Sequence, residues 1–557
     1  MHDAIRPGPV QRLARLWRTV RPLKPRQVWG RLAFKLARPA PEMQAPPQRR
    51  EVSGPWVLPA RREPSLLGPQ RFSFLHHEDE LATLGWCGPQ VPRLWRYNQH
   101  YFDDLNAREA SQRQDWHAAL LQRWVDENPP GLGEGWEPYP TALRIVNWVK
   151  WWALGSPAQA PWLHSLAVQA RWLRRRLEWH LLGNHLFADA KALVLAGLFF
   201  QGDEAEAWLA EGLRILDAEI AEQILPDGGQ FERSPMYHAL ALEDLLDLLN
   251  AAAAWAPAES AVRRRLPAWR QCASGMLFWL RCMSHPDGGI AFFNDAAHGV
   301  APDNAELERY ARELGVDADA APAEGLTHLA DCGYVRMASG EARVWLDVAP
   351  IGPDYLPGHA HADTLSFELS LGGRRGVGNG GTSRYGLGPE RERERGTAAH
   401  STVQLAGEDS SEVWSGFRVG RRARVFDLQV QDRCVLAAHD GYRHLPGAPV
   451  HRRRWVLRRN GLIVSDNVEP AGQPAVARFH LAPGLALHSE GGGRWTVLDG
   501  DAPLARVHVV QGAARACPSR HAPAFGRVLE TQMLEVTLAA GHACTLWTHT
   551  PSCTSSS

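Results

Sequence analysis

Cysteine is scarce in this sequence, and its cysteines form no pattern. The 557 residues contain eight Cys, none of them in a Cys-x-x-Cys pair. This scatter argues against a zinc ribbon and against a disulfide framework. Long apolar runs are missing as well. No stretch approaches the length that a bilayer span needs, so we expect no transmembrane segment.

The chain also has no excess charge of either sign, because 61 Lys and Arg match 61 Asp and Glu. Nucleic-acid-binding domains are typically basic, so we expect no nucleic acid partner. Tyrosine is infrequent, with 9 residues, whereas tryptophan is abundant, with 23. Many tryptophans are expected in the core, although an excess also suits stacking on the apolar faces of sugars.

The chain is too long for one hydrophobic core, so several domains are expected. Residues 1–70 form a basic, Pro-rich segment. Through most of residues 71–325 apolar residues recur at helical spacing, with short Gly- and Pro-containing breaks, which predicts an α-helical domain. From residue 326 to residue 557 the period changes to two, which predicts an antiparallel β-sandwich. The fold class is therefore a multidomain α+β protein.

The N-terminal segment is basic and amphipathic. Leu13, Leu16, Trp17 and Val20 fall at helical spacing among arginines. The segment lacks the apolar core and cleavage site of a signal peptide, so a cytoplasmic location is expected unless export uses another route. Such a segment could make weak contact with an anionic membrane surface. The alternative is a packed leading helix whose arginines are solvated.

The stretch Gly358–Ser370 holds the densest group of chemically active residues. In its second half apolar and polar residues alternate, which predicts a half-buried strand. Continued backwards, the same face carries His359, His361 and Asp363. Placing such groups at the edge of a core is unfavourable unless they are paired, ligated or used. We therefore interpret this stretch as part of a functional site.

Polar clusters also interrupt the apolar helices of the first half. They are Gly183-Asn184-His185, the stretch from Glu232 to His238, and Phe293-Asn294-Asp295. Ser234-Pro235 indicates a helix start with Ser as the N-cap, which places Tyr237 in the first turn.

In the second half, Asn379 follows the central strand and His400 opens another strand. Between them, residues 390–395 alternate in charge. We interpret this run as a solvated loop, although Arg393 or Arg395 could meet an acidic substrate.

Taken together, these stretches resemble the heparinase II/III family of polysaccharide lyases, with related alginate lyases. The resemblance extends over roughly residues 94–465 and rests on the order of individually modest motifs. Two further motifs that carry it are Trp95-Arg96-Tyr97-Asn98-Gln99-His100 and Trp136-Glu137-Pro138-Tyr139-Pro140. It implies an incomplete (α/α) toroid followed by an antiparallel β-sandwich. It also implies a periplasmic or cell-envelope location as the alternative to the cytoplasm.

The resemblance further implies β-elimination on a uronic-acid polysaccharide. In this reaction a base removes the C5 proton, the 4-O glycosidic bond breaks, and a C4–C5 double bond forms. Residues matching the family's catalytic positions are Asn184, assisted by His185, for neutralising the carboxylate, and Tyr237 and His359 for proton transfer. The remaining residues expected to contact an anionic polysaccharide or oligosaccharide are Glu232, Arg233, Trp136, Asn294 and Arg395.

Family members also hold a metal, usually zinc, near the cleft. The matching ligand positions are His361, Asn379 and His400. An Asp is usual where Asn379 stands, and a neutral amide is a weak zinc ligand. Asp363 could replace it. Zinc or another divalent cation is therefore a possible cofactor that the residues leave open.

Two other functions remain compatible with these residues. A uronate C5-epimerase would share the proton abstraction but return a proton to C5. A carbohydrate-binding component of polysaccharide synthesis would use the same cleft without catalysis. Glycoside hydrolysis is not favoured, because the sequence offers no convincing carboxylate pair.

Overall fold

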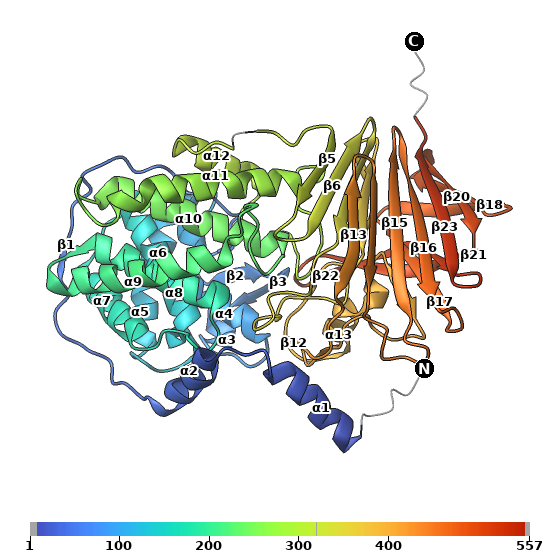
Figure 1. The fold of residues 1–557 in the computed structure, drawn as a ribbon. Helices are drawn as coiled ribbons and strands as arrows, with labels where there is room; N and C mark the ends of the chain where they lie inside the picture. Colours follow the sequence, from blue (N-terminus) through green and yellow to red (C-terminus); the bar gives the residue numbers. More distant parts are fainter. Residues whose placement is uncertain (1–7, 319, 552–557) are drawn as a thin grey trace, which may run out of the picture.

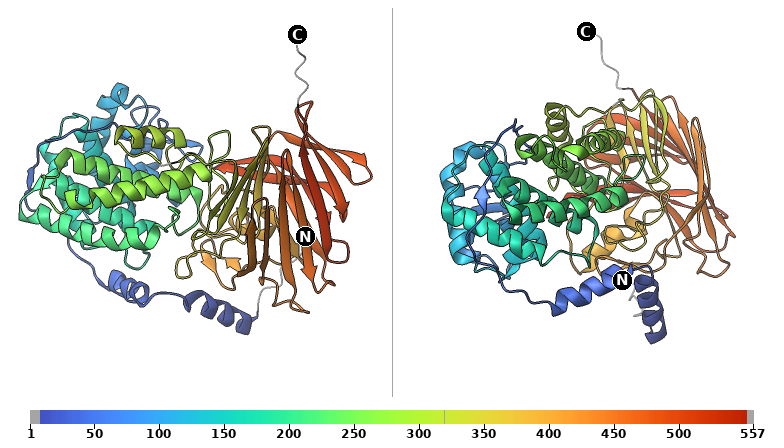
Figure 2. Two further views of the ribbon diagram at one scale, coloured as in Figure 1. Left: turned by 45° about the horizontal axis from the view of Figure 1, so that its top comes forward. Right: turned by 60° about the vertical axis from the view of Figure 1, so that its left-hand side comes forward.

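The structure is a computed structural model that describes residues 8–318 and 320–551. Its helices and strands are segregated, with the helices of the first half on one side of the molecule and the strands of the second half on the other (Figure 1). Two further views show the same segregation (Figure 2). The predicted α+β architecture, helices first and an antiparallel β region second, is confirmed.

The helical domain is assembled around α8 (Gly183–Phe199). Every residue of α8 from Leu186 onwards is buried, which explains why its sequence is apolar on all sides. Helices α6, α7, α9 and α10 pack against it. The helices of this domain are α3 (Leu81–Leu84), α4 (Arg93–Tyr101), α5 (Gln114–Glu127), α6 (Pro138–Ala153), α7 (Ala160–Arg174), α9 (Asp203–Gln223), α10 (Pro235–Trp255), α11 (Leu266–Cys282) and α12 (Asn304–Glu313).

Short elements connect these helices. The 3-10 helices are η1 (Asp103–Asn106), η2 (Ala110–Arg113), η3 (Glu134–Trp136), η4 (Arg263–Arg265) and, in the β region, η5 (Thr397–Ala399). The short strands are β1 (Gln48–Arg49), β2 (Arg71–Phe74), β3 (His77–Glu80) and β4 (Phe200–Gln201). β1 pairs with β4, which fastens the N-terminal connector to the end of α8.

The β domain consists of two large antiparallel sheets. One sheet runs β21-β22-β17-β9-β8-β7-β6-β5, with β10 paired to β17, and the other runs β13-β14-β15-β16-β23-β20-β19-β18. Apolar side chains of both sheets, such as Leu369 and Val464, meet in one core. The predicted β-sandwich is therefore confirmed.

The strands of the two sheets have the following bounds. Those of the first sheet are β5 (Gly325–Leu329), β6 (Tyr334–Ser339), β7 (Ala342–Asp347), β8 (Phe367–Leu371), β9 (Arg374–Gly378), β10 (Val403–Leu405), β17 (Ala475–Leu481), β21 (Ala513–Ala524) and β22 (Arg527–Thr537). Those of the second are β13 (Val425–Gln431), β14 (Cys434–His439), β15 (Val450–Arg458), β16 (Gly461–Glu469), β18 (Leu485–Gly491), β19 (Arg494–Asp499), β20 (Ala502–Gln511) and β23 (His542–His549). A separate hairpin pairs β11 (Val413–Trp414) with β12 (Arg418–Val419).

The strand predicted over the central stretch is shorter than its alternation suggested. β8 begins at Phe367, and residues 358–366 form a loop. Leu365 has a φ of 61°, and the N–H of Ser366 donates to the carbonyl of Asp363, so a turn precedes the strand. The prediction that His359, His361 and Asp363 stand on one strand face is therefore wrong.

The strand β8 is also not half-buried. All of its residues are buried, including the polar ones. The burial of Glu368 and Ser370 is compensated, because both side chains form hydrogen bonds with the imidazole of His285, at 2.7 and 2.8 Å. The polar residues that alternate with apolar ones in β8 therefore bond to a buried histidine and do not face solvent.

The charged run at residues 390–395 is not a solvated loop. It forms α13 (Pro389–Arg395), in which Arg391, Glu394 and Arg395 are buried. Because residues three and four apart share one face of a helix, this run places two guanidinium groups inside the protein. Only the opposite face, where Arg393 pairs with Glu390, meets solvent.

The abundant tryptophans mainly build the core. Those that are less than 2% exposed are Trp95, Trp124, Trp148, Trp152, Trp162, Trp208, Trp255, Trp279, Trp345, Trp455 and Trp547. Packing rather than sugar stacking therefore accounts for most of the excess. The cysteines within residues 8–318 and 320–551 are all free, as predicted, while Cys553 lies outside this range.

The first part of the N-terminal segment, residues 9–36, contributes no apolar residue to either core, whereas Ala60 and Leu66 later in the segment belong to the helical core. Helices α1 (Pro9–Val20) and α2 (Pro25–Leu36) run along the lower edge of the molecule (Figure 1). The alternative of a packed leading helix is wrong, because α1 has no buried residue. Among the residues described, none of the helices combines the length and the apolarity that a membrane span requires.

Candidate active site

The candidate site lies where the N-terminal ends of α8 and α10 meet a loop of the β domain. Leu182 and Gly183 have φ values of 63° and 56°, which turn the chain sharply just before Asn184. A Cβ atom at Gly183 would lie 2.3 Å from Cδ2 of Leu356. Glycine therefore allows the β-domain loop to approach the start of α8 closely.

Tyr237 and His359 come together at this junction. The hydroxyl of Ser234 caps α10 and accepts a hydrogen bond from the N–H of Tyr237 at 3.2 Å, so Tyr237 stands in the first turn as predicted. The Tyr237 ring lies 3.9 Å from the His359 ring, centroid to centroid, and its hydroxyl is 2.8 Å from that of Tyr385. Burial and the neighbouring Tyr385 raise the pKa of Tyr237 well above its usual value, so the phenol is protonated.

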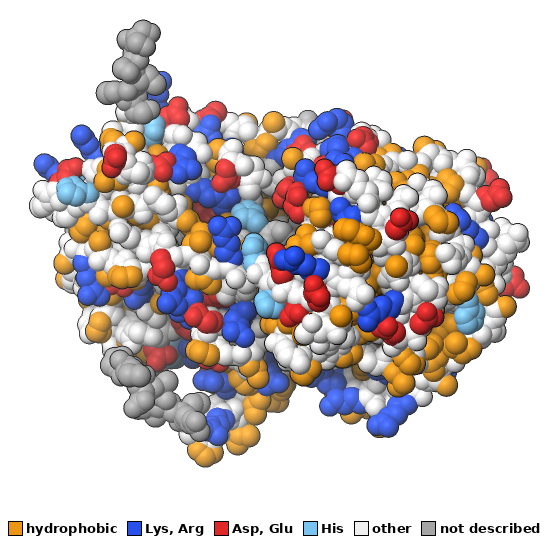
Figure 3. Space-filling view, turned by 180° about the vertical axis from the view of Figure 1, so that it is seen from behind, with side chains coloured by type: hydrophobic (Ala, Val, Ile, Leu, Met, Phe, Trp, Pro, Cys, Tyr) orange, Lys and Arg blue, Asp and Glu red, His pale blue; other side chains and the backbone are white. Residues whose placement is uncertain are grey.

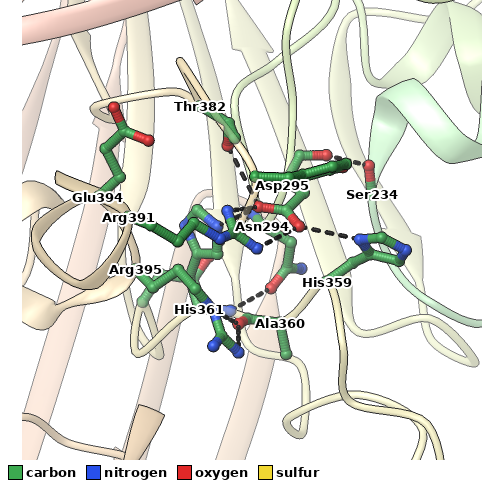
Figure 4. Close-up of polar contacts among 12 residues, drawn as sticks. Ser234, Asn294, Asp295, His359, Ala360, His361, Thr382, Arg391, Glu394 and Arg395 are labelled. Atoms are coloured by element: carbon green, nitrogen blue, oxygen red, sulfur yellow. Dashed lines mark hydrogen bonds and ion pairs between the residues drawn. The ribbon is translucent and has the colours of Figure 1, made fainter. Parts of the chain in front are cut away.

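Asp295 is the centre of a buried polar network (Figure 4). Its carboxylate accepts hydrogen bonds from Nδ1 of His359 at 2.9 Å and from Nε2 of His361 at 2.8 Å. The guanidinium of Arg391 forms a bidentate pair with it. Burial opposes ionisation, but Arg391 outweighs it and holds the pKa of Asp295 well below its usual range. An ionised Asp295 keeps the proton of His359 on Nδ1 and leaves Nε2 facing the site.

Glu232 connects the helical side of the site to the β side. One of its oxygens lies 3.7 Å from Nε2 of His359, and the backbone N–H of Asn184 is near enough to lower the pKa of its carboxyl group. Burial raises the pKa of Glu232, which favours its neutral form. The adjacent His185 is 2.8 Å from the Glu178 carboxylate. Burial lowers the pKa of His185 but Glu178 raises it more, so the imidazole gains a proton readily.

A cavity of 510 Å³ extends from His185 into the helical domain, which is a size typical of ligand sites. Its walls combine aromatic and charged side chains, among them Tyr97, Tyr139, Trp136, Arg93 and Arg176. In the space-filling view, histidine and basic side chains gather in the hollow between the two halves of the molecule (Figure 3). A larger cavity of 810 Å³, bordered by α10, α11 and α12, contains none of the predicted catalytic residues.

Two of the three predicted metal ligands converge. Nδ1 of His361 and Nε2 of His400 lie 3.0 Å apart. The other ring nitrogens face the carboxylate of Asp295 and the carbonyl of Gly396, to which they donate. Burial lowers the pKa of both imidazoles, to about 4 for His361. The two facing nitrogens therefore offer lone pairs to a single cation.

The third predicted ligand, Asn379, has its oxygen engaged by a backbone group. Oδ1 of Asn379 accepts a hydrogen bond from the N–H of Ser401 at 3.1 Å, and its Nδ2, which cannot ligate, is buried without a partner in the described structure. Asp363 accepts the N–H of Asn294. Within the described ranges, no group of three or more His, Cys, Asp or Glu is arranged to hold a metal. Two nitrogens without a third donor do not fit zinc.

Two sequence models of one family match this chain. The one described as "Heparinase II/III N-terminus" matches residues 106–313, and the one described as "Heparinase II/III-like, C-terminal" matches residues 321–548. The chain belongs to the heparinase II/III family. This family member is 26% identical over 318 residues to the heparin-sulfate lyase of Pedobacter heparinus, covering 51% of this chain and 46% of the relative. It is 28% identical over 342 residues to FtsZ-localized protein C of Caulobacter vibrioides, covering 56% of each.

This heparinase II/III family member thus spans about half the length of these curated relatives. Among solved structures, it superposes on heparinase III with a TM-score of 0.61 at 17% identity, covering 84% of this chain and 80% of that one. It superposes on heparan sulfate lyase HepC from Pedobacter heparinus with a TM-score of 0.55 at 18% identity, covering 94% and 87%. These similarities show the shared fold, a helical toroid followed by a β-rich domain.

Two residues predicted to bind substrate also make contacts that join the two domains of the family member. The Arg233 guanidinium donates to the carbonyl of Cys332 at 2.9 Å, and its own carbonyl accepts from Nδ2 of Asn294 at 2.9 Å. The side-chain carbonyl of Asn294 accepts the N–H of His361 at 3.1 Å. Both residues have positive φ, near 60°, and Asn294 holds the loop that carries the histidines.

The other predicted substrate-binding residues divide between the cavity and the interior. Arg395 is 1% exposed and donates to the carbonyl of Ala360 at 2.8 and 3.0 Å, so it shapes the loop from inside. Trp136 is buried, but its ring lines the cavity. Glu232 lies beside the catalytic candidate His359. The structure thus brings together Asn184, His185, Glu232, Tyr237 and His359.

Several residues of the site were not predicted. Asp295 directly follows Asn294 in a motif that the sequence does display, so its position offered a signal. Arg391 was hidden in the alternating charged run. Tyr385 and Glu178 gave no local signal, because only the fold brings them beside Tyr237 and His185.

Proposed function

We propose that this chain is a carbon–oxygen lyase that cleaves a uronic-acid-containing polysaccharide by β-elimination. The observation that carries the proposal is the stacking of Tyr237 on His359, at 3.9 Å, with His359 oriented by an ionised Asp295. Two groups able to exchange protons therefore stand together, and Asn184 and His185 at the start of α8 can bind the substrate carboxylate.

His359 is the proposed base. Its Nδ1 proton is held by Asp295, so Nε2 is the nitrogen that takes the C5 proton. Asp295 also stabilises the imidazolium that results, in the way that a buried carboxylate assists a catalytic histidine. Because Arg391 keeps Asp295 ionised, this assistance is available at neutral pH.

Tyr237 is the proposed acid. As the C4–O bond breaks, the electrons of the C5–H bond form the C4–C5 double bond, and the phenol of Tyr237 gives its proton to the departing 4-O oxygen. The hydrogen bond between Tyr237 and Tyr385 offers a second hydroxyl that can return the proton.

Asn184, assisted by His185, is the proposed group that neutralises the substrate carboxylate. The side-chain amide of Asn184 is half-buried and makes no hydrogen bond within the described residues, so it is available to a ligand. A protonated His185 adds positive charge nearby. The raised pKa of Glu232 reduces the repulsion that an ionised carboxylate would cause.

The proposed substrate class is an anionic polysaccharide or oligosaccharide. The names of the Pedobacter heparinus relatives, heparin-sulfate lyase and heparan sulfate lyase, support this class. The 510 Å³ cavity leads to His185 and carries tyrosines together with Arg93 and Arg176. No step of the proposed reaction requires a metal ion, since the residues at the candidate ligand positions do not fit zinc.

A non-catalytic carbohydrate-binding role is the second candidate. It is favoured by the similarity to FtsZ-localized protein C, whose name gives a location and not a reaction. This similarity covers 56% of the chain, whereas that to the heparin-sulfate lyase of Pedobacter heparinus covers 51%. A uronate C5-epimerase would use the same base and return the proton to C5.

One experiment separates these functions. The purified chain is incubated with a panel of heparosan, hyaluronan, alginate and bacterial exopolysaccharides, and ultraviolet absorbance is followed. A lyase produces a conjugated C4–C5 double bond that absorbs. An epimerase produces no absorbance but exchanges solvent deuterium into C5, and a binding protein does neither while still retaining one of the polysaccharides.

A further inference from the structure

Helix α1 is amphipathic in the opposite sense to the surface helix of a globular protein. Two of its basic side chains, Arg15 and Arg18, face the protein and pair with Glu412. The hydroxyl of Thr19 accepts a hydrogen bond from Nε1 of Trp414 at 3.2 Å. Surface helices normally turn their apolar stripe to the core, whereas α1 turns it away.

The outward face of α1 is apolar along its whole length. Val10, Leu13 and Trp17 are 79%, 68% and 64% exposed, and Leu16 and Val20 are exposed beside them. These positions recur at helical spacing, so they form one stripe from the first turn to the last. Within the described structure nothing covers this stripe, since α1 has no buried residue.

Helix α2 continues the same surface. One side is fixed to the protein, because Gln27 donates to the carbonyl of Tyr355 at 3.2 Å and the Phe34 ring lies 4.4 Å from the His180 ring. The opposite side exposes four large apolar side chains: Val28, Trp29, Leu32 and Leu36. Both helices lie along the lower edge of the molecule in two views (Figures 1 and 2), and hydrophobic and basic side chains stand side by side at that edge (Figure 3).

The segment that carries this face is strongly basic. Residues 8–41 contain nine Lys and Arg and no Asp or Glu, in a chain whose charges otherwise balance. Some of these groups anchor the segment to the protein, by the ion pairs with Glu412 and by those of Lys24 and Arg26 with Glu222. Others are exposed next to the apolar face: Arg21, Arg31, Lys35 and Arg38.

We propose that α1 and α2 form a docking surface for an anionic phospholipid membrane. Such a surface requires exposed apolar side chains that enter the boundary of the acyl chains, and basic side chains that meet the phosphates. Trp17 and Trp29 provide the amphipathic rings that prefer this boundary. Excess positive charge complements an anionic lipid surface, and the absence of any acidic residue from 8 to 41 removes the repulsion that would weaken it.

The test is flotation of the full chain with lipid vesicles. One set contains phosphatidylcholine alone and the other contains phosphatidylcholine with phosphatidylglycerol, each at low and at moderate salt. We expect binding to the anionic vesicles, weakened by salt. Trp17→Ser and Trp29→Ser should each reduce the affinity by about tenfold or more, since each removes a large apolar side chain that the proposed binding would bury in the membrane.

The matched control is Val510→Ser, which removes an apolar side chain that is 60% exposed on β20, in the β domain. It should leave vesicle binding unchanged, and all three variants should melt like the parent chain. Failure of the parent chain to bind anionic vesicles, or binding that Trp17→Ser and Val510→Ser reduce equally, overturns the proposal. A concentration-dependent dimer in solution that Trp17→Ser abolishes also overturns it and assigns the face to a second copy of the chain. These outcomes do not depend on whether the chain has lyase activity.

Discussion

Replacing Tyr237 by phenylalanine removes one oxygen atom from the candidate site and leaves the ring in place. The ring stays stacked on His359 at 3.9 Å, and the N-cap bond from the Tyr237 N–H to Ser234 is unaffected. What is lost is the hydroxyl, its 2.8 Å hydrogen bond to Tyr385, and the proton that the proposed reaction delivers to the leaving oxygen.

The structural and catalytic roles of this hydroxyl differ in expected magnitude. Loss of one buried hydrogen bond should reduce the free energy of unfolding by about 1–2 kcal/mol. Loss of a general acid should lower turnover by about 10²-fold or more, which corresponds to about 2.7 kcal/mol or more of activation free energy. The two effects are measured separately, by thermal melting and by the rate of ultraviolet product formation.

Tyr442→Phe is the matched control. Tyr442 is fully buried in the β domain, and its hydroxyl donates to the carbonyl of Val403 at 2.8 Å. This variant should show a similar loss of stability and keep its turnover. If Tyr237→Phe cleaves at nearly the parental rate on a substrate that the parent chain degrades well, the assignment of Tyr237 as the acid is refuted.

Four further predictions follow from the geometry. His359→Ala should lower turnover about as much as Tyr237→Phe, and the double variant should lose far less than the product of the two factors, because both residues act in one reaction. Asp295→Asn should lower the free energy of unfolding by about 3–5 kcal/mol, since it leaves the Arg391 guanidinium buried without its counter-charge. The pKa of His185 is raised, so its positive charge is present below this pKa and is lost as the pH rises above it. The value of kcat/KM should therefore fall as the pH rises above the pKa of His185, and His185→Gln should abolish this fall. Dialysis against a chelator should leave turnover unchanged, which a loss restored by zinc would contradict.

Much of the fold could be predicted from the sequence because its periodicities are local. Helical spacing up to Glu313 and alternation after Gly325 reflect which face of each element is buried. The predictions from periodicity were wrong where both faces of an element, or its charged face, are buried. β8 alternates in polarity although both of its faces are buried, and the charged run of α13 hides Arg391 inside the protein.

The candidate site could be predicted only where its residues stood in recognisable motifs. Asn184, Tyr237 and His359 belong to such motifs, and the structure brings them to one junction. Arg233 and Asn294 belong to motifs as well, but their polar atoms serve internal contacts. A motif fixes which residue types are present and cannot say which atoms are already engaged.

The sequence by itself determined the order of helices and strands, the start of α10 at its Ser-Pro cap, and the presence of histidines beside a core strand. Each depends on residues that are neighbours along the chain. The tertiary structure alone decided that Asp295 joins His359 to Arg391, that the oxygen of Asn379 accepts the N–H of Ser401, and that α1 directs its apolar face outward. These outcomes depend on contacts between groups far apart in the chain, which local periodicity does not encode.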